Sequence, residues 1–295
     1  MEQKRNKTFL HKFLVKAAGA VSAAFIENHL LQVSNYTIVS EKIPAAFQDF
    51  KIMQLSDLHS KRFGHDNVRL IRKIDAVQPD LLVMTGDMIS RSDSNHNVFF
   101  QLAETLAKEY PCYYVIGNHE QDMKPHELKL FLANLTATGI RVMENENVEI
   151  CKEDQKISLY GLSLPLKYYK QSKLWSAPAV PFGEREMERA MGQYNSAQYG
   201  ILLTHNPLCF AAYAQWGADL TLCGHIHGGM IRLPFAGGLL SPEREFFPKY
   251  SAGIYEYSGK KMLVSRGLGS GTFGIRIFNC PEIVVITLAH SHSQM

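Results

Sequence analysis

The feature of this sequence that most constrains its fold is segment 81–87, Leu-Leu-Val-Met-Thr-Gly-Asp. Its four apolar residues and its threonine predict a strand that is buried on both faces, as in a parallel sheet. Gly86 then lets the chain turn sharply, which places Asp87 at the carboxyl end of a central strand. Active sites of open α/β sheets gather at such strand ends. A single aspartate in this position is more commonly a helix cap or a turn residue, so the other strand ends have to be compared with this one.

Four other strand-like runs are followed by residues of the same chemical kind, which bind metal ions or transfer protons. The runs are 50–55, 112–116, 199–203 and 220–223, and the residues that follow them are Asp57 and His59, Asn118 and His119, His205, and His225 and His227. Residues two apart in an extended segment point to the same side, so an Asp-x-His or His-x-His pair can contact one ion. Glycines around His225 and His227 leave room for an ion, whereas two imidazoles buried as core residues would each need a partner.

Seven nitrogen and oxygen donors are therefore expected to meet in one cavity, because the carboxyl ends of these strands converge. The donors are Asp57, His59, Asp87, Asn118, His205, His225 and His227. One ion with positions open for substrate needs fewer, so two ions that share a carboxylate fit the set better. Taken singly, each pattern also has a structural interpretation, since Asp-x-His can face solvent and Gly-Asn can form a turn that carries a surface histidine.

The composition favours one folded α/β domain. The chain has 295 residues, of which 46% are hydrophobic and 20% are charged, and these values suit a domain with a substantial core. A net charge of +3 is too weak to predict nucleic acid as a partner. The five cysteines form no CxxC pair and are expected to be free, mostly buried thiols. The sequence does not indicate an oligomeric state.

Apolar periodicity predicts the remaining elements. Helices are expected over residues 67–77, 98–107, 125–138, 184–191 and 207–216. An alternating edge strand is expected over residues 36–43, and strands of a second sheet or its edge at Val142, 148–150 and 157–160. Three later strands, 254–257, 261–265 and 283–288, are predicted to complete the second sheet. The strand-helix-strand unit that ends at Asp87 should have a right-handed crossover.

Residues 1–33 are expected to form a basic and apolar leader outside the domain of residues 34–295. Five bases oppose one acid, Glu2, in the first sixteen residues, and they are Lys4, Arg5, Lys7, Lys12 and Lys16. The apolar run 17–26 that follows has about ten residues, whereas a bilayer span needs roughly 20. Three interpretations stay open: the core of a secretory signal, a basic amphipathic helix lying on an anionic membrane, and an ordinary helix packed on the domain.

Five motifs follow one another along the chain. They are Asp57-x-His59, Gly86-Asp87, Gly117-Asn118-His119-Glu120, Thr204-His205 and Gly224-His225-x-His227. In this order, over residues 51–229, they resemble the calcineurin-like metallophosphoesterase family. Segments 228–234, 241–242, 247–250 and 265–269 resemble a narrower branch, the bacterial membrane-associated phosphodiesterases of the YkuE/YaeI type and the UDP-2,3-diacylglucosamine pyrophosphatases. Met230 stands where this branch is expected to have glutamine.

The resemblance implies a four-layer αββα sandwich of two mixed sheets, the metallo-dependent phosphatase fold, with its site at the strand ends. It also implies two divalent metal ions, the first held by Asp57, His59 and His227, the second by Asn118, His205 and His225, with Asp87 bridging both. Imidazole together with carboxylate suits Mn²⁺, Fe or Zn²⁺ better than Mg²⁺ or Ca²⁺. His119 is implied to donate a proton to the leaving oxygen or to stabilise charge on the phosphoryl group, without binding metal, and Glu120 to orient His119.

A protein of this kind would be a dinuclear metal-dependent phosphoesterase that hydrolyses a phosphodiester or pyrophosphate bond through a hydroxide bridging the two ions. The substrate would be a small-molecule, lipid-linked or envelope phosphate, with a membrane surface as a partner, and a membrane-associated or extracytoplasmic location is expected over a cytoplasmic one. Segment 234–250 combines aromatic rings with neighbouring bases and so suits an amphiphilic phosphate, although the rings can instead pack beneath their own loop. The rings are Phe235, Phe246, Phe247 and Tyr250, and the bases are Arg232, Arg244 and Lys249. An alternative is a non-catalytic metal-binding scaffold at the membrane or cell envelope.

Overall fold

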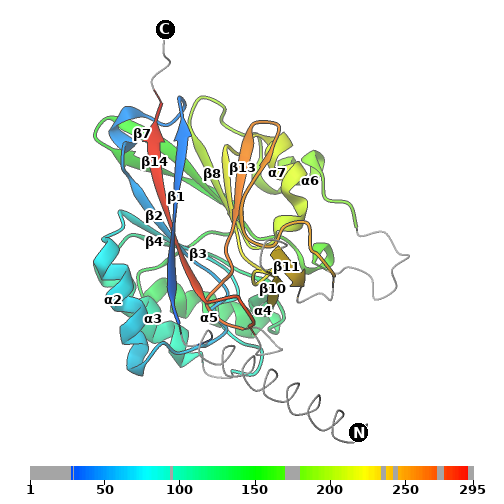
Figure 1. Ribbon diagram of the computed structural model, residues 1–295. Helices are drawn as coiled ribbons and strands as arrows, with labels where there is room; N and C mark the ends of the chain where they lie inside the picture. Colours follow the sequence, from blue (N-terminus) through cyan, green and yellow to red (C-terminus); the bar gives the residue numbers. More distant parts are fainter. Residues whose placement is uncertain are drawn as a thin grey trace, which may run out of the picture.

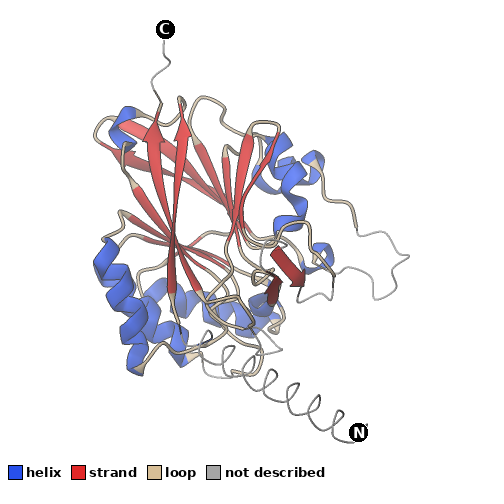
Figure 2. Ribbon diagram, in the orientation of Figure 1, coloured by secondary structure: helices blue, strands red, loops and turns tan. Residues whose placement is uncertain are grey.

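The computed structural model describes residue 28 and residues 30–93, 96–169, 180–233, 237–241, 245–270 and 276–291. Within these residues, two six-stranded sheets pack face to face, and helices cover the outer face of each (Figures 1 and 2). The predicted four-layer α/β sandwich of two mixed sheets is thus confirmed. Most of the leader lies outside the described residues, and the first strand begins at Gln32.

The first sheet has the strand order β1-β14-β2-β3-β4-β5. Its strands are β1 (Gln32–Ser40), β2 (Lys51–Leu55), β3 (Leu81–Thr85), β4 (Cys112–Val115), β5 (Arg141–Val142) and β14 (Glu282–His290). β1 lies at one edge, as its alternating sequence predicted. β2, β3 and β4 run parallel, so their carboxyl ends lie along one edge of the sandwich.

The prediction that residues 283–288 complete the second sheet is wrong. β14 lies in the first sheet, where it pairs parallel with β1 and antiparallel with β2. Residues 282–286 are all buried, and a run that is buried on both faces has to occupy an interior position of a sheet. Val142 also belongs to the first sheet, because β5 pairs with β4 there.

The second sheet has the strand order β12-β13-β9-β8-β7-β6. Its strands are β6 (Glu146–Lys152), β7 (Gln155–Leu162), β8 (Gly200–Thr204), β9 (Leu220–Cys223), β12 (Gly253–Tyr257) and β13 (Lys260–Val264). The four central strands run parallel, and the two edge strands, β6 and β12, are antiparallel to their neighbours. β8 and β9 therefore end at the same edge of this sheet, as the sequence predicted.

Helices of the expected length cover each outer face. The α-helices are α2 (Val68–Val77), α3 (Asn97–Glu109), α4 (Asn118–Gln121), α5 (Pro125–Ala137), α6 (Glu184–Met191) and α7 (Phe210–Trp216). Single turns of 3₁₀-helix occur at η1 (Ala45–Phe47), η2 (His65–Asn67), η3 (Leu166–Tyr168) and η4 (Pro207–Cys209). α2, α3 and α5 pack on the first sheet, whereas α6 and α7 pack on the second. None of the helices in the described part of the chain has the length and apolar character to span a bilayer.

β3 shows why the central segment of the sequence is apolar throughout. Leu82 and Met84 face the core under α2, α3 and α5, whereas Leu81 and Val83 face the core between the two sheets. All five residues of the strand are buried, as predicted. The strand is therefore fixed on both faces, and this holds Asp87 in place just beyond its end.

The cysteines only partly match their prediction. None of the five forms a disulfide, and Cys112 and Cys223 are buried, but Cys209 and Cys280 are half-buried and Cys151 is exposed.

A small third sheet pairs β10 (Ile231–Leu233) with β11 (Gly237–Leu240). It follows His227, the last residue of the site motifs, along the chain.

Candidate metal centre

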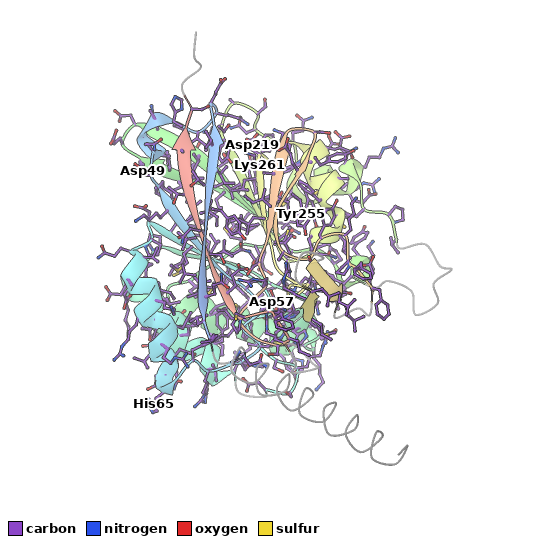
Figure 3. The ribbon with its side chains drawn as sticks, in the orientation of Figure 1. Asp49, Asp57, His65, Asp219, Tyr255 and Lys261 are labelled. Atoms are coloured by element: carbon purple, nitrogen blue, oxygen red, sulfur yellow. The ribbon has the colours of Figure 1, made fainter. Side chains whose placement is uncertain are left out.

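Six of the seven predicted donors come together at one end of the sandwich, and the seventh, Asn118, adjoins His119 there. They follow β2, β3 and β4 of the first sheet and β8 and β9 of the second, so both sheets contribute. Figure 3 labels Asp57 at this end of the molecule. Three groups of side chains have donor atoms within 4.8 Å of one another: Asp57, His59 and His227; Asp87, His205 and His225; and His59, Asp87 and His119.

The first group, Asp57, His59 and His227, is compact. The two imidazole Nε2 atoms are 3.1 Å apart, and Nε2 of His227 is 3.4 Å from Oδ1 of Asp57. The ring planes of the two histidines are nearly stacked. Two ring nitrogens and a carboxylate oxygen that face one another at these distances can all bind one cation.

Asp87 lies between the first and second groups. Its Oδ2 is 3.3 Å from Nε2 of His205 in the second group and 3.9 Å from Nε2 of His59 in the first. Its other oxygen, Oδ1, accepts a hydrogen bond of 2.8 Å from the backbone N–H of His119. One carboxylate is thus shared by both groups, which is the arrangement that a pair of ions needs.

Asn118 and His119 enter the site on the one-turn helix α4, directly after β4. Both are buried, and Oδ1 of Asn118 has no hydrogen-bond partner. Nε2 of His119 is 3.8 Å from Oδ2 of Asp87. A cavity of about 590 Å³ opens beside His119, with Phe100, Leu130 and Phe131 in its wall.

The backbone at five of the donors has a conformation that L-residues rarely adopt. The φ angles are 52° at Asp57, 48° at His59, 52° at Asp87, 74° at His225 and 53° at His227. A non-glycine residue in this left-handed region costs about 1 kcal/mol or more, although aspartate and histidine tolerate it better than most. Such strain accumulates at functional sites, where the surrounding fold holds it in place.

Two glycines bring the strand ends close enough together. A Cβ on Gly86 would lie 2.6 Å from the backbone nitrogen of Gly117, and a Cβ on Gly117 would lie 2.2 Å from Oδ1 of Asp87. The two loops therefore touch backbone to backbone, and any side chain there would displace Asp87. The glycines of the motifs serve this close approach.

The far side of two imidazole rings is fixed by backbone carbonyls. Nδ1 of His205 is 2.6 Å from the carbonyl oxygen of Thr85, and Nδ1 of His227 is 3.3 Å from that of Gly269. A carbonyl can only accept, so Nδ1 carries the proton in both rings. Nε2 is then the atom presented to the site, as in metal-binding histidines whose second nitrogen donates a hydrogen bond.

Burial and the two carboxylates set the charges. Burial lowers the pKa of His59 to about 3 and that of His227 well below its usual value. Burial also acts against protonation of His205, but Asp87 and Asp57 outweigh it and raise the pKa of His205 to about 10. Burial would raise the pKa of Asp87, yet His205 and the other imidazoles hold it well below its usual value. The carboxylate pair therefore favours positive charge between its oxygens, whether it comes from a proton or a metal ion.

Glu120 bonds to backbone N–H groups, which differs from its predicted role of orienting His119. Its Oε2 accepts hydrogen bonds from the backbone N–H groups of Gly117 and Asp87, at 2.8 and 3.0 Å. Its Oε1 accepts from Met88 and Ile89, at 2.8 and 3.3 Å. The carboxylate thus positions the loop that carries Asp87, whereas the sequence had suggested that it orients the ring of His119.

Three further residues at the site were not predicted. Ser56 donates a hydrogen bond of 2.6 Å to Oδ2 of Asp57. The ring of Tyr169 packs edge-on against His225 at 5.1 Å, and its hydroxyl is buried without a hydrogen-bond partner. Arg276 is buried and donates to the carbonyl of Gly269, which also faces His227. Ser56 adjoins the first motif, whereas nothing in the local sequence distinguishes Tyr169 or Arg276 from other loop residues.

These side chains fit a pair of divalent ions. Oδ1 of Asn118 and Nε2 of His205 are buried without a hydrogen-bond partner, and Nε2 of His227 faces the imidazole Nε2 of His59 at 3.1 Å. Two carboxylates, one of them shared, supply the negative charge that two cations require. The mixture of imidazole, carboxylate and amide donors is typical of transition-metal sites.

Comparison with known families and proteins gives a consistent picture. The model of the calcineurin-like phosphoesterase family matches residues 50–229. The chain is 29% identical to the metallophosphoesterase YkuE of Bacillus subtilis, covering 98% of this chain and 99% of that protein. It is 28% identical to the phosphodiesterase YaeI of Escherichia coli, with 91% and 94% covered. It is 25% identical to the UDP-2,3-diacylglucosamine pyrophosphatase LpxG of Chlamydia muridarum, with 90% and 91% covered.

Proposed function

The chain belongs to the calcineurin-like phosphoesterase family and is a phosphoester hydrolase, and on this premise we propose that it cleaves phosphodiester or pyrophosphate bonds with two divalent metal ions. The observation that carries the proposal is the position of Asp87, whose Oδ2 faces His205 on one side and His59 on the other. We assign Asp57, His59 and His227 to one ion and Asn118, His205 and His225 to the second. Asp87 would contact both.

Two such ions, when bound, supply positive charge that polarises a phosphoryl oxygen and acidifies a water molecule. The residues of this chain set the rest of the chemistry. The carbonyls of Thr85 and Gly269 hold His205 and His227 in the tautomer that presents Nε2, and Glu120 fixes the loop of Asp87. The donors are thereby oriented before substrate arrives, so little reorganisation is needed during the reaction.

His119 is the proposed proton donor. It lies on the wall of the cavity, and its backbone N–H is bonded to Asp87 while its ring is free of any hydrogen bond at Nδ1. When water adds to phosphorus and the bond to the leaving oxygen breaks, that oxygen needs a proton, which the imidazole of His119 can supply. Mn²⁺, Fe and Zn²⁺ are the ions that the donor set favours.

The proposed substrate class is an amphiphilic phosphodiester or pyrophosphate, including lipid-linked ones. Two relatives, one a phosphodiesterase and the other a UDP-2,3-diacylglucosamine pyrophosphatase, support both bond types. The cavity beside His119 supports an apolar portion of the substrate, since Phe100, Leu130 and Phe131 line it and Leu130 is 63% exposed. A substrate alcohol with an apolar part would bury that surface.

Hydrolysis of a chromogenic phosphodiester in the presence of Mn²⁺ tests the proposal. The Asp87→Asn protein should turn over about a thousandfold more slowly, because the shared carboxylate no longer carries the charge that holds two ions. Asp80→Asn is the matched control, since Asp80 is exposed at the opposite end of β3 and should leave the rate unchanged. Equal rates for Asp87→Asn and wild type would refute the proposal. Metal uptake by the wild type without hydrolysis of any phosphate ester would favour the scaffold instead.

A further inference from the structure

The small third sheet has a partly exposed apolar face. Ile231 pairs with Leu240 and with Ile277, and Leu240 pairs with Phe246, so these four side chains share one face. All four are apolar, and Phe246 is 60% exposed. We call residues 231–233, 237–240, 246–247 and 277–278 the flap.

The flap also concentrates exposed aromatic surface. In the described ranges, the exposed phenylalanines are Phe246, Phe247 and Phe278, at 60%, 58% and 58%, and all three belong to the flap. Leu233 of β10 is 38% exposed. For Phe246 and Phe247 the alternative that the rings pack beneath their own loop is therefore wrong, whereas Tyr250 is buried and Phe235 lies outside the described residues. Exposed phenylalanines gathered in one place indicate a surface that binds something apolar.

The flap is built directly on the metal centre. Asn279 donates from Nδ2 to the carbonyl of His227 at 2.6 Å, and Arg232 donates to the carbonyl of Gly228 at 3.0 Å. A Cβ on Gly229 would lie 2.7 Å from Cα of Gly238, so the loop after His227 and β11 touch backbone to backbone. Whatever the flap binds is thus held beside the site. Figure 1 shows β10 and β11 at the end of the sandwich where α4 lies.

The basic leader joins the fold at the same edge. The carbonyl of Asn28 accepts a hydrogen bond of 2.7 Å from Lys61, two residues after His59. Oδ1 of Asn28 is 3.2 Å from Oγ of Ser270, which follows the carbonyl that Arg276 and His227 contact. The sequence before Asn28 holds five bases and one acid within its first sixteen residues. Asn28, the first described residue after this basic stretch of sequence, therefore lies beside the metal centre, as the flap does.

We propose that the flap inserts its phenylalanines into the surface of a bilayer that contains anionic phospholipid, and that this docking presents lipid-borne phosphate to the metal centre. The second part rests on the proposed function, whereas the docking itself does not require turnover. The leader's five bases match an anionic surface, and exposed Lys249 adds a positive charge next to the phenylalanines. A second copy of the chain is a poorer occupant, because pairing two flaps would bring two copies of exposed Lys249 together and oppose like charges.

Sedimentation of the full chain with vesicles tests the docking. The vesicles are phosphatidylcholine with an equal amount of phosphatidylglycerol, compared with phosphatidylcholine alone. The Phe246→Ser/Phe247→Ser protein should bind the anionic vesicles about tenfold more weakly, because two exposed rings no longer leave water. Val39→Ser/Ile254→Ser is the control, since these residues are 49% and 41% exposed outside the flap, and it should bind as the wild type does.

Two further measurements separate docking from catalysis. The Asp87→Asn protein should bind vesicles as the wild type does, and the flap variant should hydrolyse a soluble chromogenic phosphodiester at the wild-type rate. Unchanged vesicle binding by the flap variant, or an equal loss in the control, would overturn the proposal. Light scattering that shows a wild-type dimer and a monomeric flap variant, without vesicle binding, would overturn it in favour of a contact between copies.

Discussion

Strand β9 carries a charged cluster at each end, and the two clusters differ in kind. At its start, Asp219 accepts hydrogen bonds from Lys42 and Lys260, both at 2.6 Å, and from Tyr194 at 2.5 Å. At its other end, His225 joins Asp87 and His205. Figure 3 labels Asp219 and Asp57 at opposite ends of the sandwich.

The difference lies in what surrounds each carboxylate. Every partner of Asp219 named above is a donor, so its negative charge is compensated within the protein and the cluster serves to join β9 to its neighbours. Around Asp57 and Asp87 the neighbouring groups are imidazole rings, and Nε2 of His205 and His227 can bind a cation when Nδ1 carries the ring's proton. Carboxylates that face imidazole nitrogens rather than lysine ammonium groups can share a cation, and for this reason burial and charge alone do not identify a functional site.

The largest expected difference is in catalysis. His225→Ala should lower kcat/KM about a thousandfold, or about 4 kcal/mol in activation free energy, because a ligand of one proposed ion is removed. Its urea midpoint should stay close to the wild-type value, since the ring is held mainly by other site residues. Initial rates and urea unfolding measure the two effects. If Asp219→Asn reduces turnover per folded molecule as strongly, the two ends of β9 do not differ in function.

Asp219→Asn should lower the stability of the fold and leave catalysis almost unchanged. It leaves Lys42 and Lys260 without their carboxylate and should lower the free energy of unfolding by about 3 kcal/mol, a value limited by the partial solvation of both lysines. Turnover per folded molecule should stay within about twofold of wild type. Asp154→Asn, in the exposed turn between β6 and β7, is the control for losing one negative charge. A stable Asp219→Asn protein would contradict the structural role of the cluster.

Glu120→Gln should show a mixture of both effects, since this carboxylate accepts from four backbone N–H groups while holding the loop of Asp87. A glutamine offers one acceptor oxygen and turns an NH₂ group toward donors, so the free energy of unfolding should fall by about 2 kcal/mol and kcat by about tenfold. Glu127→Gln is the matched control, because Glu127 bonds to a backbone N–H at the same position of α5 but is exposed. A fall in stability without any loss of kcat would show that Glu120 does not position Asp87.

The smallest expected effect is a pH dependence of stability. Burial alone would raise the pKa of Asp219, but hydrogen bonds from Lys260, Lys42 and Tyr194 hold it below the usual 3.8. When folding lowers the pKa of a carboxyl group, the stabilisation is fully present above the pKa of the unfolded state. It is lost as the pH falls through the pKa of the folded state. The stability gap between wild type and Asp219→Asn should therefore be constant at neutral pH and close below about pH 4, by at most about 1.4 kcal/mol per pH unit. Urea midpoints across that range measure the gap, and a gap that widens in acid would contradict the assignment.

Prediction from the sequence succeeded where the signal is local. The run before Asp87 alternates between two cores, so its uninterrupted apolar character identified a central strand. The His-x-His and Asp-x-His pairs correctly predicted side chains that lie together, because a site at strand ends places its residues just after apolar runs. Residues 283–288 were assigned to the wrong sheet because the sequence of an apolar strand does not indicate which sheet it joins.

The sequence by itself determined the strands, the helices that cover them and the kinds of donor that follow each strand, because these depend on the spacing of neighbouring residues. Only the tertiary structure decided that donors from two sheets meet, that five of them are held at positive φ, and that Glu120 bonds to backbone rather than to His119. Only the packed structure could distinguish Phe246, which stays exposed, from Tyr250, which is buried. Burial, charge compensation and strain arise from contacts between segments that are distant along the chain, so no single stretch of sequence encodes them.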